Sequence, residues 1–132
     1  IKAILGVGDL ETLRNVAKAS LVCMMAGADF IKTSTGKESI NANLNNSLVM
    51  LRMIRDFYTK TGKKIGFKPA GGISTAKSVL EFLILVAEEL GFEWVNPKLL
   101  RIGASSLLID IERQLYHYTS GRYANKEKLA IG

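Results

Sequence analysis

The sequence has few of the residues that would mark several common classes of protein. It contains one cysteine and one histidine in 132 residues. A single cysteine cannot form an intrachain disulfide, and Cys23 lies among apolar residues, so we expect a buried thiol in a reducing compartment. The expected location is the cytoplasm, with the nucleus as an alternative. Histidine, cysteine and carboxylate residues form no cluster typical of a metal site, and we expect neither a metal nor another cofactor.

Long apolar runs are also missing. A bilayer span needs roughly 20 apolar residues, and the longest candidate, residues 78–87, is interrupted by Glu81. We therefore expect no membrane partner. The chain begins with neither a methionine nor a charged segment that leads into an apolar one, which is typical of an internal cut and not of a signal peptide. We expect a fragment of a longer protein.

The net charge is positive, but the basic residues are spread along the chain. The net charge is +6, from 18 basic and 12 acidic residues. Lysine and arginine form no run of five and are not interleaved with aromatic residues, so nucleic acid is not favoured as a partner. A basic balance also suits a small phosphorylated substrate, and the charge alone does not decide between the two.

Four β-rich segments alternate with four longer segments of helical period. The expected strands are residues 1–5, 28–33, 64–68 and 99–103. Alternation at a spacing of roughly 30 residues implies parallel strands joined by right-handed crossovers. The fold class is therefore α/β. We assign residues 1–118 to one domain and residues 119–132, which have little apolar period, to a surface tail.

Apolar residues three or four positions apart define the expected helices. They are Leu10, Leu13, Ala17, Leu21 and Met24; Leu44, Leu48, Leu51, Ile54 and Tyr58; Ala76, Leu80, Leu83, Ala87 and Leu90; and Leu108, Ile111, Leu115 and Tyr118. The expected N-caps are Asp9, the asparagine-rich start at 41–46, Ser74, and Ser105 or Ser106. Gly27, Gly62 and Gly91 are placed to end the first three helices.

Two lysines stand near the ends of successive strands. Lys32 shares a strand face with Phe30, and Lys68 shares one with Gly66. If the strands are neighbours, about 4.8 Å apart, two like charges oppose double protonation and one amine loses its proton more easily. A neutral amine can attack a carbonyl carbon to form a Schiff base. The alternative is that each lysine reaches solvent or pairs with a carboxylate.

Small and polar residues follow the later strands. Residues 33–36 follow the second, Gly71 and Gly72 follow the third, and Ser105 and Ser106 follow the fourth. Glycine amides and a helix N-terminus can bind an anion, and the last two loops of a β/α barrel often hold a phosphate. The alternative is that the serines are helix caps and the glycines a turn.

Residues 27–37, 66–72 and 101–106 resemble three successive motifs of the deoxyribose-phosphate aldolase family. Residues 50–57 and 110–117 make the resemblance closest to the animal-type enzymes, and it extends over about residues 1–121. The resemblance implies the last four βα units, the C-terminal half, of an eight-stranded (β/α)8 TIM barrel.

The resemblance also implies an activity and roles for residues. The family are class I aldolases, lyases that cleave 2-deoxy-D-ribose 5-phosphate reversibly into acetaldehyde and D-glyceraldehyde 3-phosphate, in deoxyribonucleotide catabolism. Lys32 would form the Schiff base, and Lys68 would tune it and assist proton transfer. The phosphate site would be lined by Gly71, Gly72, Ser105 and Ser106, with Lys37 adding positive charge.

The chain also departs from the family pattern. A complete barrel typically needs about 250 residues, and the family's catalytic aspartate belongs to the half that is absent here. Asp29 is no substitute, because its odd spacing from Lys32 turns it to the other strand face. We therefore expect little or no activity from this chain alone. Unpaired strand edges and a bare sheet face also predict self-association into a homo-oligomer.

Two other functions remain open at this stage. One is a different Schiff-base enzyme with a phosphate-binding barrel. The other is a non-catalytic basic domain that binds nucleic acid or a protein.

Overall fold

The computed structural model describes residues 1–125 and residue 129. Its elements, in chain order, are β1 (Lys2–Ile4), α1 (Leu13–Met25), β2 (Phe30–Lys32), α2 (Leu44–Thr61), β3 (Gly66–Lys68), α3 (Ala76–Leu90), the 3-10 helix η1 (Phe92–Trp94) and α4 (Leu107–Ser120). The strands form a parallel sheet in the order β1-β2-β3. The predicted alternation of strand and helix and the parallel pairing are therefore confirmed.

The fourth predicted strand, residues 99–103, is only partly formed. It runs parallel to β3 through two isolated bridges, Phe67 with Leu100 and Ala70 with Gly103. The interruption has a local cause, because Pro69 lies between the two bridges and lacks the N–H that the ladder would need there. The Pro69 carbonyl still accepts from the Gly103 N–H at 2.8 Å. The segment thus completes a fourth βα unit without forming a continuous strand.

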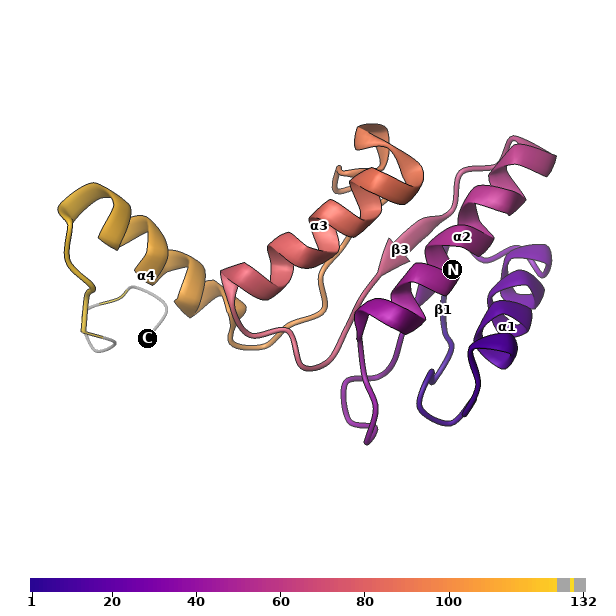
Figure 1. Cartoon of the computed structure of the whole chain (residues 1–132), viewed down its shortest axis with the longest axis horizontal. Coiled ribbons are helices and arrows are strands. Elements are labelled where there is room, and N and C mark those ends of the chain that lie inside the picture. The colour runs from indigo at the N-terminus through magenta and orange to yellow at the C-terminus, as the bar shows by residue number, and fades with distance from the viewer. Residues whose placement is uncertain (126–128, 130–132) are drawn as a thin grey trace.

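Helices cover one face of the sheet, and in Figure 1 α1, α2 and α3 follow one another across it in chain order. Ile31 and Phe67 are paired in register and are fully buried. The core that forms around them comprises Val7, Val16, Met24, Met50, Leu51, Ile54, Ile65, Val86, Leu90, Trp94 and Leu100. Because side chains alternate along a strand, Lys32 and Lys68 lie on the opposite sheet face. That face is open, and Ile4 on it is 47% exposed.

The first helix starts later than the sequence predicts. It begins after Thr12, whose side chain accepts from the Asn15 N–H, and Asp9 instead lies in the preceding turn. The buried residues of α1 are Val16, Ser20 and Met24. Ser20 is tolerated there because its hydroxyl donates to the Val16 carbonyl at 2.8 Å.

The other helices show related corrections. The N-cap of α3 is Thr75 and not Ser74, in a capping box with Ser78. The buried positions of α3 are Phe82, Val86 and Leu90, whereas Leu80 is 56% exposed. In α2 the predicted asparagine-rich start is confirmed, with Asn43 as N-cap and Gly62 in the left-handed conformation at its end. The buried residues of α2 are Asn46, Ser47, Met50, Leu51 and Ile54.

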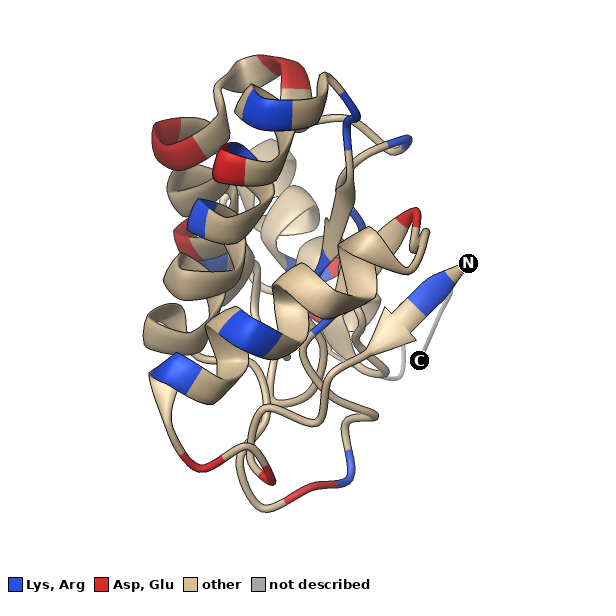
Figure 2. Cartoon of the chain, turned by 90° about the vertical axis from the view of Figure 1, so that its right-hand side faces the viewer, with Lys and Arg blue, Asp and Glu red and all other residues tan. Residues whose placement is uncertain are grey.

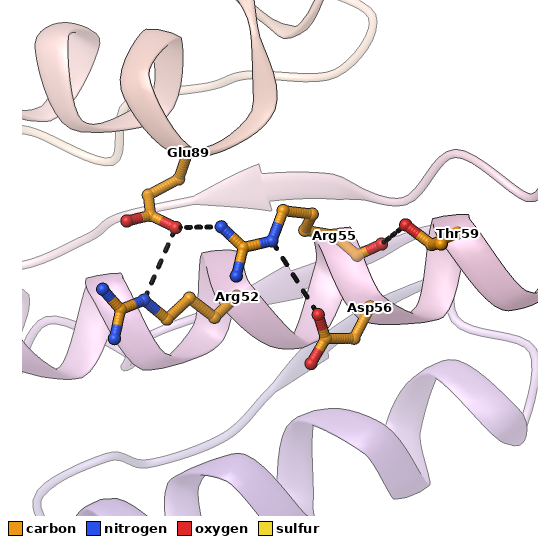
Figure 3. A network of polar contacts seen from close by, with 5 residues as sticks. All are labelled: Arg52, Arg55, Asp56, Thr59 and Glu89. Atoms are coloured by element: carbon orange, nitrogen blue, oxygen red, sulfur yellow. Dashed lines mark hydrogen bonds and ion pairs between the residues drawn. The ribbon is translucent and has the colours of Figure 1, made fainter.

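A polar network joins α2 to α3 (Figure 3). Glu89 of α3 accepts from Arg55 at 2.7 Å and lies 3.5 Å from the Nε of Arg52, both on α2. The Glu89 side chain is only 15% exposed, so its carboxylate is partly shielded from solvent. Asp56 completes the network on the Arg55 side, at 3.8 Å. The network fixes how the two helices that flank β3 lie against each other.

Helix α4 lies beyond α3, at the opposite end of the molecule from α1 (Figure 1). Leu107 is the buried residue of α4. Its predicted apolar stripe is largely exposed, with Leu108 at 60%, Leu115 at 61% and Tyr118 at 89%. The helix continues to Ser120 and ends at Gly121 in the left-handed conformation. The domain boundary at 118 and the surface tail stay predictions, and most of the tail, residues 126–128 and 130–132, lies outside the described residues.

Three further expectations can be compared with the described residues. Cys23 is partly buried against the core and is not fully enclosed as predicted. Within the described chain, no helix combines the length and the apolarity that crossing a membrane would require. Figure 2 shows lysine and arginine distributed over helices, strand and loops, which agrees with the absence of a basic run in the sequence.

Candidate active site

Lys32 and Lys68 are direct neighbours in the sheet. The register aligns Ile4 with Lys32 and Lys32 with Lys68, so the two lysine side chains leave the same face at the same height. Both are partly buried and both border a cavity of about 540 Å³. The structure therefore brings the two lysines together at one cavity.

The other predicted site residues border the same cavity. Its lining consists of Lys32, Thr35, Gly36, Lys37, Lys68, Ala70, Gly71, Gly72, Ile73, Ser74, Ile102, Gly103, Ala104, Ser105 and Ser106. These residues come from the loops that follow β2, β3 and the partial fourth strand. The carboxyl ends of parallel strands meet at one edge of the sheet, which is why three distant segments of the chain converge here. Asp29 is not among the lining residues and pairs with the amino group of Ile1.

The site is strongly cationic around Lys68. Burial lowers the pKa of Lys68, and the positive charges of Lys2, Lys32 and Arg101 lower it further, in that order. The sequence reasoning missed Lys2 and Arg101. Alternation along β1 places Lys2 on the Lys32 side, and this signal could have identified it.

The Phe30 ring lies close to two of these cations. Lys2 Nζ lies 5.2 Å and Arg101 Cζ 5.3 Å from its centroid, within the range of cation–π attraction. The ring occupies the space above Gly66, where an added Cβ would lie 2.3 Å from a ring carbon. Gly66 is therefore required by the position of Phe30.

Hydroxyl groups at the end of β2 hold the next loop in place. Thr33 and Ser34 are fully buried and their hydroxyls lie 3.1 and 2.7 Å from the Ala70 carbonyl. The Ala70 N–H in turn donates to the Thr33 oxygen at 2.9 Å. The sequence had suggested phosphate binding for Thr33 and Ser34, but these two residues do not border the cavity. Their hydroxyls position the loop instead.

Asn41 joins the two glycine-containing loops, and the sequence reasoning missed it. Its Oδ1 lies 2.8 Å from the Ser34 hydroxyl and its Nδ2 donates to the Glu38 carbonyl at 2.6 Å. Gly71, with a φ of +88°, packs so closely on Asn41 that a Cβ there would lie 2.5 Å from Oδ1. Gly36 is next to Gly71, since a Cβ on Gly36 would lie 3.8 Å from the Gly71 Cα. The glycines thus bring two loop backbones to one side of the cavity.

The loop after β2 already holds an anion of its own. The N–H groups of Thr35, Gly36 and Lys37 donate to the Glu38 carboxylate at 2.9, 3.1 and 3.3 Å. Hydrogen bonding, first of all from the Thr35 N–H, lowers the pKa of Glu38 to about 2. The sequence reasoning did not single out Glu38, because a lone glutamate after a lysine has no distinctive spacing.

Ser106 is the N-cap of α4, but its side chain makes no capping hydrogen bond. Ser105 and Ser106 both border the cavity, so the capping interpretation does not account for their hydroxyls. Asp110, one turn into α4, accepts from the Ala76 N–H at 2.7 Å. This bond holds the start of α4 beside the start of α3. Among the described residues, no group of three or more histidine, cysteine or carboxylate side chains is arranged to hold a metal.

Comparison with known proteins agrees with this geometry. Residues 6–108 match the model of the DeoC/LacD family aldolases. The chain is 67% identical to deoxyribose-phosphate aldolase of Mus musculus and 65% identical to that of Homo sapiens, each over 124 residues. These alignments cover 94% of this chain and 39% of each relative. The chain therefore spans well under half the length of these relatives.

Solved structures support the fold. A Toxoplasma gondii ME49 protein, provisionally described as a deoxyribose-phosphate aldolase, superposes in its apo form with a TM-score of 0.75 at 21% identity. The superposition covers 92% of this chain and 46% of the other. A second crystal structure of that description gives a TM-score of 0.71 over 77% of this chain and 41% of the other, at 22% identity. The predicted partial β/α barrel is confirmed.

The family match over most of the chain and the high identity to curated aldolases lead to one assignment: this chain belongs to the DeoC/LacD family of aldolases.

Proposed function

We propose that this chain supplies the Schiff-base and phosphate-binding half of a deoxyribose-phosphate aldolase. The substrate is 2-deoxy-D-ribose 5-phosphate, and the reversible products are acetaldehyde and D-glyceraldehyde 3-phosphate. The observation that carries the proposal is the registered pair Lys32 and Lys68 on one sheet face, at a cavity shared with three polar loops. The mouse and human relatives, named as deoxyribose-phosphate aldolases, support the choice of substrate.

In the proposed reaction the neutral amine of Lys32 attacks the aldehyde carbon of the open-chain sugar, and loss of water gives an iminium ion. The iminium at C1 accepts the electron pair of the bond between C2 and C3. That bond breaks when a base removes the proton of the C3 hydroxyl, which releases glyceraldehyde 3-phosphate and leaves an enamine. Protonation of the enamine and hydrolysis then release acetaldehyde and restore the amine.

Lys68 is the proposed partner of Lys32. Because burial and three cations lower the pKa of Lys68 itself, it releases a proton more readily than an exposed lysine. Lys68 is therefore suited to move a proton at the reacting carbon, the assisting role proposed for it.

The phosphate of the substrate would bind at the other end of the cavity. Gly72, Ser105 and Ser106 offer backbone N–H groups and hydroxyls at the cavity. Ser105 and Ser106 stand at the start of α4, whose dipole favours an anion. The Gly71 N–H already donates to the Gly103 carbonyl at 3.3 Å, so Gly71 contributes the close approach of its backbone to the cavity. Lys37 borders the same cavity and adds a positive charge. A phosphate held there fixes the distance between the sugar carbonyl and the lysine pair.

This chain alone lacks the catalytic carboxylate that the family carries in the other half of the barrel, so we expect it to turn over poorly without that half. In the complete enzyme, we propose a role in deoxyribonucleotide catabolism in the cytoplasm.

Reductive trapping tests the proposal. The full-length protein, in which these units complete a barrel, is incubated with acetaldehyde and borohydride and then mapped by peptide mass spectrometry. We expect a two-carbon increment on Lys32, loss of labelling in Lys32→Met, and no loss in the matched surface variant Lys98→Met. Labelling that survives in Lys32→Met would contradict the proposed nucleophile.

Two further measurements separate the alternatives. Cleavage of deoxyribose 5-phosphate by the full-length protein distinguishes this aldolase from another Schiff-base enzyme with a phosphate site. An unlabelled Lys32 combined with tight, salt-sensitive RNA binding would instead favour a basic interaction domain.

A further inference from the structure

Three consecutive backbone N–H groups, those of Thr35, Gly36 and Lys37, converge on the Glu38 carboxylate. Such a concave run of amides is a general anion-binding arrangement in proteins, also used for phosphate groups. Gly36 makes the curvature possible through its φ of +96°, which side-chain-bearing residues rarely adopt. We call these three amides the 35–37 nest.

The nest belongs to the wall of the active-site cavity. All three of its residues border the cavity together with Lys32 and Lys68. Gly36 also packs next to Gly71 of the proposed phosphate site, as the close approach of the two backbones shows. An anion bound beside Gly71 and Gly72 is therefore close to amides that are already committed to a carboxylate.

We propose that the Glu38 carboxylate is an internal competitor for the substrate phosphate: it occupies the 35–37 nest in the empty enzyme and leaves when a phosphorylated substrate binds. This inference rests on the proposed function, which places the substrate phosphate in the adjoining loops. It adds a device that sets the affinity for the phosphate end of the substrate.

Glu38 is suited to this role by its charge and by its position. The amides keep its pKa at about 2, so the side chain stays an anion over the whole range in which the enzyme would work. It is exchangeable because it is only partly buried and no lysine or arginine forms an ion pair with it among those found in the described chain.

Phosphate can replace the Glu38 carboxylate in the 35–37 nest because it is the stronger hydrogen-bond acceptor. A phosphate dianion brings more charge and one more oxygen than a carboxylate, and hydrogen bonds to ionised acceptors strengthen with charge. The Glu38 carboxylate still lowers the apparent affinity for phosphate. Phosphate can bind only to the fraction of molecules in which the Glu38 side chain has moved out of the nest. The binding of a phosphorylated ligand is thus weakened by the free energy needed to displace Glu38, whereas the binding of an unphosphorylated aldehyde is not.

The test compares the wild-type full-length protein with Glu38→Gln, which keeps the length of the side chain and one amide oxygen but removes the charge. We expect inorganic phosphate to bind about tenfold more tightly to Glu38→Gln, as measured by calorimetry, since a neutral acceptor holds the nest less strongly. The Michaelis constant for deoxyribose 5-phosphate should fall in parallel, with that for unphosphorylated deoxyribose unchanged. Glu88→Gln, an exposed carboxylate on α3, is the matched control and should bind phosphate as wild type does.

A second measurement separates exchange in the nest from the simple loss of a nearby negative charge. In ¹⁵N-labelled wild-type protein, phosphate should shift the amide resonances of Thr35, Gly36 and Lys37. Tighter phosphate binding in Glu38→Gln without these shifts would overturn the proposal, as would unchanged or weaker binding in that variant.

These outcomes are independent of the aldolase reaction. Calorimetry and amide shifts require no turnover, so a positive result would stand even if Lys32 were never trapped by borohydride. Conversely, trapping at Lys32 with normal cleavage and no effect of Glu38→Gln would refute the competitor and leave the proposed function intact.

Discussion

At the scale of single residues, Lys68 occupies the least favourable position for a charge. Its pKa is lowered by burial first and then by Lys2, Lys32 and Arg101. In the unfolded chain these influences vanish and the pKa returns to 10.5. The folded state therefore binds a proton at Lys68 less tightly than the unfolded state does, which costs stability wherever the amine is charged in both states.

The stability cost of the charged Lys68 amine depends on pH. The penalty is fully present below the folded pKa of Lys68, shrinks as the pH rises toward 10.5, and is absent above that value. We predict that Lys68→Met is more resistant to urea than wild type at pH 7 and that this difference narrows as the pH approaches 10.5. Urea midpoints at several pH values measure it, with exposed Lys98→Met as the control. A difference that stays constant with pH would show that the lost charge is not the cause.

At the scale of elements, a hydrogen bond from the Ala76 N–H to the Asp110 carboxylate links the starts of α3 and α4. Helix α4 buries Leu107 but exposes most of its apolar stripe, so packing alone holds it weakly in the described chain. A carboxylate at the first turn of α3 also complements the dipole of that helix. Through this bond, Asp110 fixes Ser105 and Ser106 relative to the loop that contains Gly71 and Gly72.

We predict that Asp110→Ala destabilises the protein by about 1 kcal/mol, the usual cost of losing a side-chain acceptor at a helix start. Asp110→Asn keeps an acceptor oxygen and should lose less. The free energy of unfolding measures both effects, and hydrogen exchange at the Ala76 amide locates them. Gln114→Ala, at an exposed position on α4, controls for general damage to the helix. Unaltered exchange at Ala76 in Asp110→Ala would rule out the link.

At the scale of the whole molecule, the sheet is covered on one face only. The helices bury Ile31 and Phe67, whereas the other face carries Lys2, Ile4 and the lysine pair. In a closed barrel, further strands would pair with the free edge of β1 and enclose this face. Without them, the unpaired edge and the partly apolar face can associate with another copy of the chain.

We predict that this chain, studied by itself, forms a dimer or a larger assembly through the open sheet face. Size-exclusion chromatography with light scattering gives the mass. Ile4→Lys places a charge on that face and should shift the mass toward the monomer, whereas Leu80→Lys, on the exposed side of α3, should not. A monomer at all concentrations would exclude self-association.

Much of this architecture follows from the sequence itself. Periodicity of two and of three to four along the chain predicts the α/β class, the order of the elements and the parallel pairing, because each pattern reflects one face that must be buried. Alternation within each strand groups Lys32 with Phe30 and Lys68 with Gly66. The register of β2 with β3 then places both lysines on one face. The motif resemblance gives the family. The residues that border the cavity include Lys32, Lys37, Lys68, Gly71, Gly72, Ser105 and Ser106, whereas Thr33 and Ser34 do not.

Only the tertiary structure decided which apolar residues of each helix are buried and which residues from different segments are in contact. Several helices carry more than one apolar stripe, and only packing on the sheet selects Val16 and Met24 over Leu13 and Leu21. The cations around Lys68 come from separate strands, the nest is filled by its own neighbour Glu38, and Asp110 reaches Ala76 from the next helix. Local sequence could not reveal the contacts of Lys68 and Asp110, because they depend on distances between backbones that only the folded chain brings together. The contacts of Glu38 join near neighbours in the sequence, but they depend on the positive φ of Gly36 in the folded loop.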